Sequence, residues 1–144
     1  MLTDLLGIRA FEFFDNVHVW VLQISAVDLE PCSRPMVREE LDRVAQFCRG
    51  EDHDSFIVSH GVLRYLLGKY LQQEPVAIRF VSGAQGKPLL EEEGSVEFNI
   101  THSGDLAAMA FSSHCPVGID FGTDTFVRAV GADCPPLLVC RGGE

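Results

Sequence analysis

Alternating apolar and polar positions predict a group of β-strands in the second half of the chain. Residues 96–101 (VEFNIT) alternate strictly, so their apolar side chains share one face of a strand. The polar sequence THSGD at residues 101–105 follows, where a turn is expected. Residues 106–111 are nearly all apolar, which predicts a strand buried on both faces, and residues 117–121 (VGIDF) predict a third strand.

The first half of the chain reads as strand, helix, helix and strand. Residues 17–24 alternate as a strand, and residues 37–48 and 55–73 carry apolar side chains at helical spacing. Pro75 stops the second helix, and residues 76–81 form a short strand. We therefore predict an α/β (α+β) fold in which a mixed, mostly antiparallel sheet is covered by these two helices. Within it, strand 106–111 is expected to pair with strand 117–121.

Composition narrows the classes of function. A chain of 144 residues is long enough for one domain, and its formal net charge of −10 argues against nucleic acid and anionic membrane surfaces as partners. No apolar run approaches the ~20 residues of a membrane-spanning helix. The five cysteines show no C-x-x-C spacing, which favours reduced thiols in a cytoplasmic protein.

Candidate chemistry gathers around the predicted strands. Asp120 is the only charge in its strand, where a carboxylate needs a partner or a metal, and His102 lies at the end of another strand. Lys87 follows Gly86 in a glycine-rich loop and is held beside the rigid Pro88. A hydrolase is disfavoured because no G-x-S-x-G motif is present, and a zinc site because no H-E-x-x-H motif is present.

Four sequence elements carry a resemblance to a known family. They are VLRYLL at residues 62–67, GKP at 86–88, FNITHS at 98–103 and GID at 118–120. In this order they resemble the first half of the Sfp-type 4′-phosphopantetheinyl transferases. The resemblance implies one half of the pseudo-twofold fold of that family. Arg64, in the first element, could lend its charge to the phosphates of coenzyme A or be a solvated helix residue paired with Glu or Asp, and we expect the second, structural role.

The resemblance also implies an activity and a binding site. Enzymes of this family transfer the 4′-phosphopantetheine moiety of coenzyme A to the acceptor Ser of an acyl or peptidyl carrier protein, releasing 3′,5′-ADP. Mg²⁺ bridges carboxylates and the pyrophosphate of the coenzyme, and Asp120 matches one such metal ligand. The residues implied in coenzyme A binding are Arg43, Lys87, Pro88, Thr101 and His102.

The chain departs from the family after residue 121. Gly122 stands where the family has a Glu that is a second metal ligand, and nothing matches the W-x-x-K-E-(A/S) helix of the second half. We expect a truncated chain, with residues 1–121 forming the N-terminal subdomain and the first strand of the second half, and residues 122–144 unassigned. The alternative is a non-catalytic fragment or pseudoenzyme that only binds coenzyme A or a carrier protein.

Overall fold

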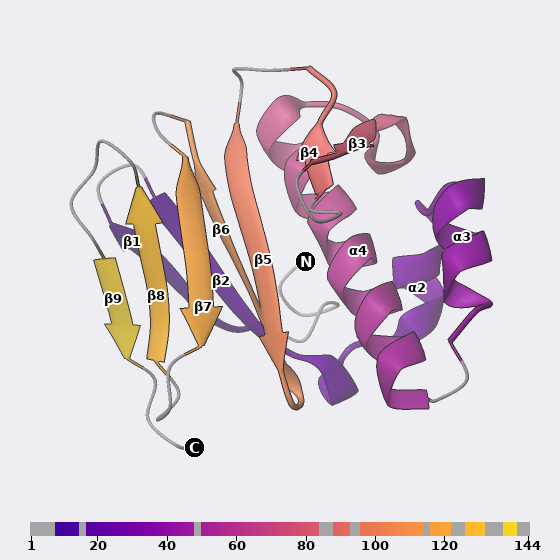
Figure 1. Cartoon of the computed structure of the whole chain (residues 1–144), viewed down its shortest axis with the longest axis horizontal. Helices are drawn as coiled ribbons and strands as arrows, with labels where there is room; N and C mark the ends of the chain where they lie inside the picture. The colour runs from indigo at the N-terminus through magenta and orange to yellow at the C-terminus, as the bar shows by residue number, and fades with distance from the viewer. Residues whose placement is uncertain are drawn as a thin grey trace. The chain divides into compact units, whose positions relative to one another are not determined.

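The fold was analysed in a computed structural model that describes residues 8–14, 17–47, 50–83, 88–92, 96–113, 116–121, 126–131 and 137–140. The chain divides into two compact units. Unit 1 combines residues 1–28 with residues 97–144, and unit 2 is the continuous stretch of residues 29–96. Figure 1 shows the strands of unit 1 and the helices of unit 2 along the chain.

A four-stranded antiparallel sheet forms the first layer of unit 1. Its strand order is β1–β2–β6–β5, so β5 and β1 lie at the two edges (Figure 1). The strands are β1 (Ile8–Phe14), β2 (Val17–Gln23), β5 (Glu97–Ser103) and β6 (Leu106–Ser112), and the short 3₁₀ helix η1 (Ile24–Ala26) follows β2. The predicted strands at residues 17–24 and 106–111 are confirmed, and the second is buried from Ala107 to Ser112.

A second antiparallel sheet lies over the first. It contains β7 (Val117–Phe121), β8 (Phe126–Gly131) and β9 (Leu137–Cys140), in that order. The expected pairing of strand 106–111 with strand 117–121 is therefore wrong. β6 already has β2 and β5 on its two edges, and β7 takes its ladder partner from residues 126–131, to which the sequence assigned no element.

Apolar side chains from both sheets form a buried cluster in unit 1. The contacting residues are Val17, Val19 and Val21 of β2, Ala108 and Ala110 of β6, and Val117 and Ile119 of β7. The β2 and β6 members are cross-strand partners in the register of the sheet, which places them on one face. Strand β7 is therefore held to this face by packing between two layers, and not by a shared ladder.

The described part of unit 2 contains three α-helices, one short 3₁₀ helix and a hairpin. The elements are α2 (Leu29–Ser33), α3 (Arg38–Val44), α4 (Gly50–Leu71), η2 (Pro75–Ala77), β3 (Phe80–Ser82) and β4 (Pro88–Leu90), with β3 and β4 paired antiparallel. The helix predicted at residues 37–48 is shorter than expected, and the one predicted at 55–73 starts five residues earlier. Of the strand predicted at 76–81, the first part is η2 and only the end belongs to β3. The α+β class is confirmed.

Helices α2 and α4 approach closely at a glycine. A Cβ atom on Gly61 would collide with the backbone carbonyl oxygen of Cys32, so only glycine fits this position without a shift. One turn further, the hydroxyl of Tyr65 donates a hydrogen bond to the carbonyl of Pro31 at 2.8 Å. Within the described part of the chain, no helix combines the length and the apolar character that crossing a membrane requires.

Candidate functional site

The side chain of Asn99 connects the two motif-bearing strands of unit 1. Its Oδ1 atom accepts a hydrogen bond from the backbone N–H of Ile119 at 3.0 Å. Asn99 belongs to FNITHS on β5 and Ile119 belongs to GID on β7, so the bond joins two motifs that lie twenty residues apart in sequence. The sequence pattern indicated no role for Asn99, because it occupies a polar position of an alternating strand. Its place beside the buried Ala110 follows only from the register of the sheet.

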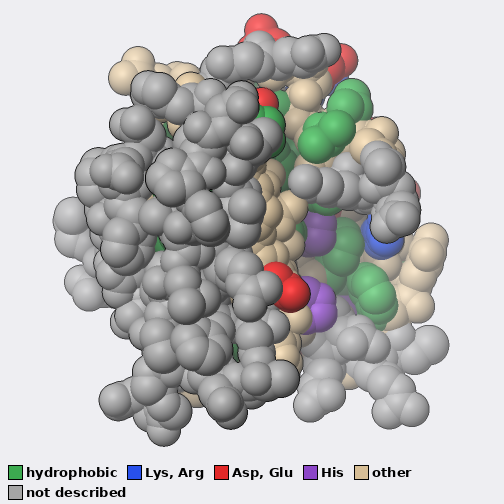
Figure 2. Space-filling model, turned by 60° about the vertical axis from the view of Figure 1, so that its left-hand side comes forward, with side chains coloured by type: hydrophobic (Ala, Val, Ile, Leu, Met, Phe, Trp, Pro, Cys, Tyr) green, Lys and Arg blue, Asp and Glu red, His purple; other side chains and the backbone are tan. Residues whose placement is uncertain are grey.

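Thr101 and His102 lie on opposite faces of β5. Successive side chains alternate along a strand, so Thr101 shares the face of Asn99, toward β7, while His102 points to the other side. Thr101 is half-buried and His102 is exposed. Acidic and histidine side chains also reach the surface on the face drawn in Figure 2. The two residues that the resemblance implies in coenzyme A binding thus lie on different faces of β5.

The turn beyond His102 is anchored to the end of β2. Gly104 has a φ of +58°, a conformation that suits glycine, and Asp105 completes the turn. The Asp105 carboxylate accepts hydrogen bonds from the Ser25 hydroxyl at 2.5 Å, the Ser25 backbone N–H at 2.9 Å and the Gln23 amide at 3.2 Å. The hydroxyl bond, followed by the bonds from Gln23 and the Ser25 backbone, lowers the pKa of Asp105.

Asp120 presents an exposed carboxylate near the end of β7. Because it is exposed, water solvates its charge, and the partner that a buried carboxylate would need is not required. Arg128 of β8 is its cross-strand partner in the register. Mg²⁺ prefers such hard oxygen ligands and binds through one or two protein carboxylates together with substrate phosphates, so Asp120 fits part of a magnesium site. Among the described residues, no three His, Cys, Asp or Glu side chains gather where they could hold a metal ion.

In unit 2, Arg43 lies at the end of a stack of three side chains. Its guanidinium carbon is 5.8 Å from the centre of the Phe56 ring, and the His60 ring stacks against the same Phe56 at 3.9 Å. Burial is the main cause that lowers the pKa of His60, although a hydrogen bond to the Phe56 carbonyl opposes it. His60 is therefore neutral at pH 7, and the exposed Arg43 carries the positive charge of this stack.

The remaining predicted residues lie at the hairpin and on α4. Pro88 is the half-buried first residue of β4, whereas Lys87 lies outside the described residues. Arg64 pairs with Glu40, as a structural role requires, but it is buried and not solvated. The structure thus joins the β5 and β7 motifs within unit 1, while Arg43 and Pro88 belong to unit 2.

The protein has an α+β fold, with two layers of antiparallel sheet in one unit and helices with a hairpin in the other. The two strands that carry the motifs are joined by a side-chain hydrogen bond. The family model described as "4′-phosphopantetheinyl transferase, N-terminal" matches residues 24–114. The chain belongs to this family of 4′-phosphopantetheinyl transferases, as its motifs indicate.

Curated relatives carry the same description. The 4′-phosphopantetheinyl transferase HetI of Nostoc sp. is 32% identical over 111 residues, which cover 74% of this chain and 47% of HetI. Sfp of Bacillus subtilis is 31% identical over 99 residues, covering 60% of this chain and 44% of Sfp. The human L-aminoadipate-semialdehyde dehydrogenase-phosphopantetheinyl transferase is 32% identical over 98 residues, covering 65% and 32%. The chain therefore spans less than half the length of these relatives.

Proposed function

We propose that this chain carries the coenzyme-A-binding half of a 4′-phosphopantetheinyl transferase. In the proposed reaction, the hydroxyl of the acceptor Ser of an acyl or peptidyl carrier protein attacks the β-phosphorus of coenzyme A. The phosphopantetheine moiety then becomes bonded to Ser, and 3′,5′-ADP leaves. The observation that carries the proposal is the hydrogen bond from Ile119 to Asn99, which supports a common site for the two motifs on β5 and β7.

Each proposed binding residue supplies a different interaction. Arg43 and Lys87 offer positive charge for phosphate groups, and the Thr101 hydroxyl and the His102 ring offer hydrogen bonds. Pro88 limits the backbone next to Lys87. The carboxylate of Asp120 would hold Mg²⁺, which when bound would offset the negative charge of the pyrophosphate. We assign no catalytic residue.

The proposal also covers the organisation and setting of the chain. Residues 1–121 would correspond to the N-terminal subdomain and the first strand of the second half, and β8 and β9 from residues 122–144 extend the sheet on one side of that strand. A cytoplasmic location is proposed because the five cysteines show no C-x-x-C spacing, which favours reduced thiols. We expect neither nucleic acid nor membrane as a partner, in keeping with the net charge of −10.

A second candidate is a non-catalytic protein that only binds coenzyme A or a carrier protein. Gly122 favours it, because this position would provide a second carboxylate for the metal if it were Glu. Incubating the 144-residue chain with coenzyme A, Mg²⁺ and an unmodified carrier protein separates the two candidates. Loading of the carrier, measured as a mass increase, requires the transferase, whereas coenzyme binding without loading supports the second candidate.

Calorimetry tests the binding that both candidates share. We expect coenzyme A to bind in the presence of Mg²⁺ more tightly than dephospho-coenzyme A, since the additional phosphate gives the basic residues another partner. Lys87→Ala should weaken binding about tenfold or more, because a hydrogen bond to a charged group contributes ~1.5–3 kcal/mol. Lys69→Ala, at an exposed position on α4, is the matched control and should bind as the unmodified chain does. Absence of coenzyme A binding would contradict the proposal.

A further inference from the structure

Unit 2 contains a buried ion pair between α4 and α3. The Arg64 side chain is 2% exposed and its Nε donates a hydrogen bond to Oε1 of Glu40 at 2.8 Å; the Glu40 side chain is 12% exposed. Replacing such a pair by apolar side chains of similar size is often neutral or stabilising. Stability alone therefore does not explain why a full charge lies at this position.

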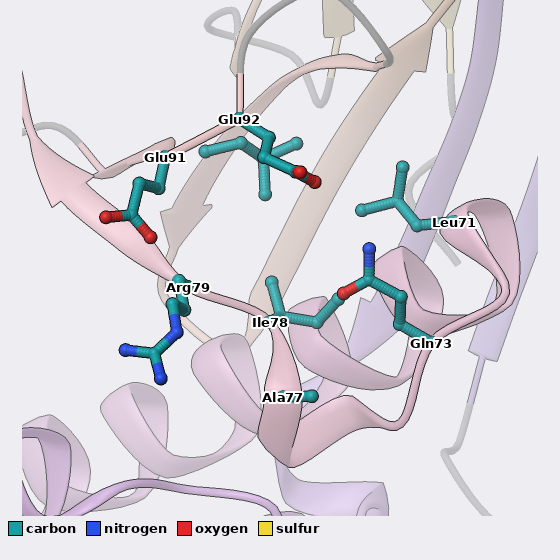
Figure 3. Close-up of a pocket in the computed structure, with 8 residues that line it drawn as sticks. Leu71, Gln73, Ala77, Ile78, Arg79, Glu91 and Glu92 are labelled. Atoms are coloured by element: carbon teal, nitrogen blue, oxygen red, sulfur yellow. The ribbon is translucent and has the colours of Figure 1, made fainter.

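The guanidinium of Arg64 also holds the chain segment that enters the β3–β4 hairpin. Its Nη1 atom donates hydrogen bonds to the backbone carbonyls of Pro75 at 2.9 Å and Ile78 at 2.7 Å, and its central carbon lies 5.0 Å from the centre of the Phe80 ring. Phe80 is the first residue of β3. Ile78 lines a cavity of about 310 Å³, where Figure 3 shows it between Gln73 and Arg79. One side chain of α4 thus fixes the entrance of the hairpin.

Glu40 extends the hydrogen bonds of Arg64 to the start of α3. The oxygen that accepts the hydrogen bond from Arg64 also accepts one from the backbone N–H of Val37, at 3.1 Å, immediately before the helix begins. Glu40 therefore fixes the first turn of α3, and Arg43 lies three residues further along this helix. The planar guanidinium can bond several partners in fixed directions, which an ammonium group cannot do.

We propose that Arg64 is a positioning residue that sets the location of Arg43 on α3 relative to Pro88 on the β3–β4 hairpin. This inference rests on the proposed function, because both residues belong to the proposed coenzyme A site. The hydrogen bonds of Arg64 reach α3 and the segment before β3, and both of these elements lie outside its own helix. Without its guanidinium, α3 and the segment before the hairpin would no longer be hydrogen-bonded to the same side chain, while the apolar contacts of α4 would remain.

Amide hydrogen exchange on the full chain tests the positioning role without any ligand. Arg64→Lys retains the positive charge beside Glu40 but cannot bond all the partners of the guanidinium, and Arg64→Met removes the charge. In both variants we expect exchange at least tenfold faster for the amide of Glu91, which bonds the Arg79 carbonyl at 3.0 Å, and for that of Leu41, which bonds the Val37 carbonyl at 3.0 Å. Amides of the β2–β6 ladder should keep their rates.

The matched control is Arg79→Met, which removes an exposed guanidinium from the same segment and should leave these rates unchanged. Unchanged exchange at Glu91 and Leu41 in Arg64→Lys would overturn the proposal. Equal acceleration throughout both units would also overturn it, since that pattern reports only a loss of global stability. If Arg64→Met does not fold, Arg64→Lys alone decides between these outcomes.

Calorimetry links the positioning role to the site. We expect Arg64→Lys to weaken coenzyme A binding about tenfold and Arg79→Met to leave it unchanged. If Arg64→Lys accelerates exchange of the hairpin but binds coenzyme A with unchanged affinity, its positioning role in the site is refuted while the proposed function stands. If the unmodified chain binds no coenzyme A, the proposed function fails, and with it the role of Arg64 in a coenzyme site.

Discussion

Replacing Asn99 by alanine should loosen β7 from the four-stranded sheet. The substitution removes the acceptor of the Ile119 N–H, which lies 3.0 Å away, and Ile119 is only 7% exposed. A buried N–H without a partner costs about 1–3 kcal/mol. For a chain of this size, each kcal/mol lowers the melting temperature by about 2–4 °C, so we expect a decrease of about 2–12 °C.

Thermal unfolding followed by circular dichroism measures this decrease, and hydrogen exchange at the Ile119 amide locates it. The control is Glu97→Ala, which truncates an exposed side chain two residues earlier on the same face of β5 and should change stability by less than about 0.5 kcal/mol. We expect the Ile119 amide to exchange faster in Asn99→Ala alone. If Asn99→Ala has the same melting temperature as the unmodified chain and its Ile119 amide is equally protected from exchange, the connection between the motifs does not depend on this bond.

Two further predictions concern stability. Gly61→Ala should destabilise the chain by up to about 2 kcal/mol, because overpacking against Cys32 costs about 1–3 kcal/mol and better helix propensity returns about 1 kcal/mol. Gly50→Ala, which has open space, is its control in thermal unfolding, and equal melting of the two variants would contradict the close approach. Asp105→Ala should melt below the unmodified chain at pH 7. Because folding lowers the pKa of Asp105 below its ordinary value of 3.8, its stabilisation is complete above that pH and is lost as the pH falls through the folded pKa. The gap in melting temperature should therefore close in acid, and a gap independent of pH would refute the role of this carboxylate.

Local sequence patterns predicted the strands that are buried along most of their length. The alternation at residues 17–24 and the apolar run at residues 106–111 identified β2 and β6, because most positions of β2 and nearly all of β6 are buried. The order of the motifs also identified the family. The start of α4 was missed because Gly50 and the acids after it lack apolar side chains at helical spacing, although acidic side chains stabilise the first turn of a helix. Helix α2 was not predicted; it contains Pro31, which disfavours a helix interior but is tolerated in the first turn.

Local sequence patterns do not determine which distant strands pair with each other. The sequence of β7 predicts a strand, but it contains nothing that chooses between β6 and β8 as its partner. That choice depends on which edges are already occupied and on the packing of Val117 and Ile119 against β2 and β6. The fork of hydrogen bonds around Arg64 was missed for a similar reason, since its carbonyl partners at Pro75 and Ile78 carry no signature in their side chains.

The insertion of unit 2 between the two segments of unit 1 has a consequence for the order of folding during synthesis. In the β2–β6 ladder, Val17 pairs with Ser112, about 95 residues later. At translation rates of about 5–20 residues per second, β2 leaves the ribosome about 5–20 s before its partner. Unit 2 is continuous, so its helices can pack during this interval. The apolar face of β2 stays without its β6 partner until residues 106–112 have been synthesised. This makes residues 17–23 a candidate binding site for chaperones on the nascent chain.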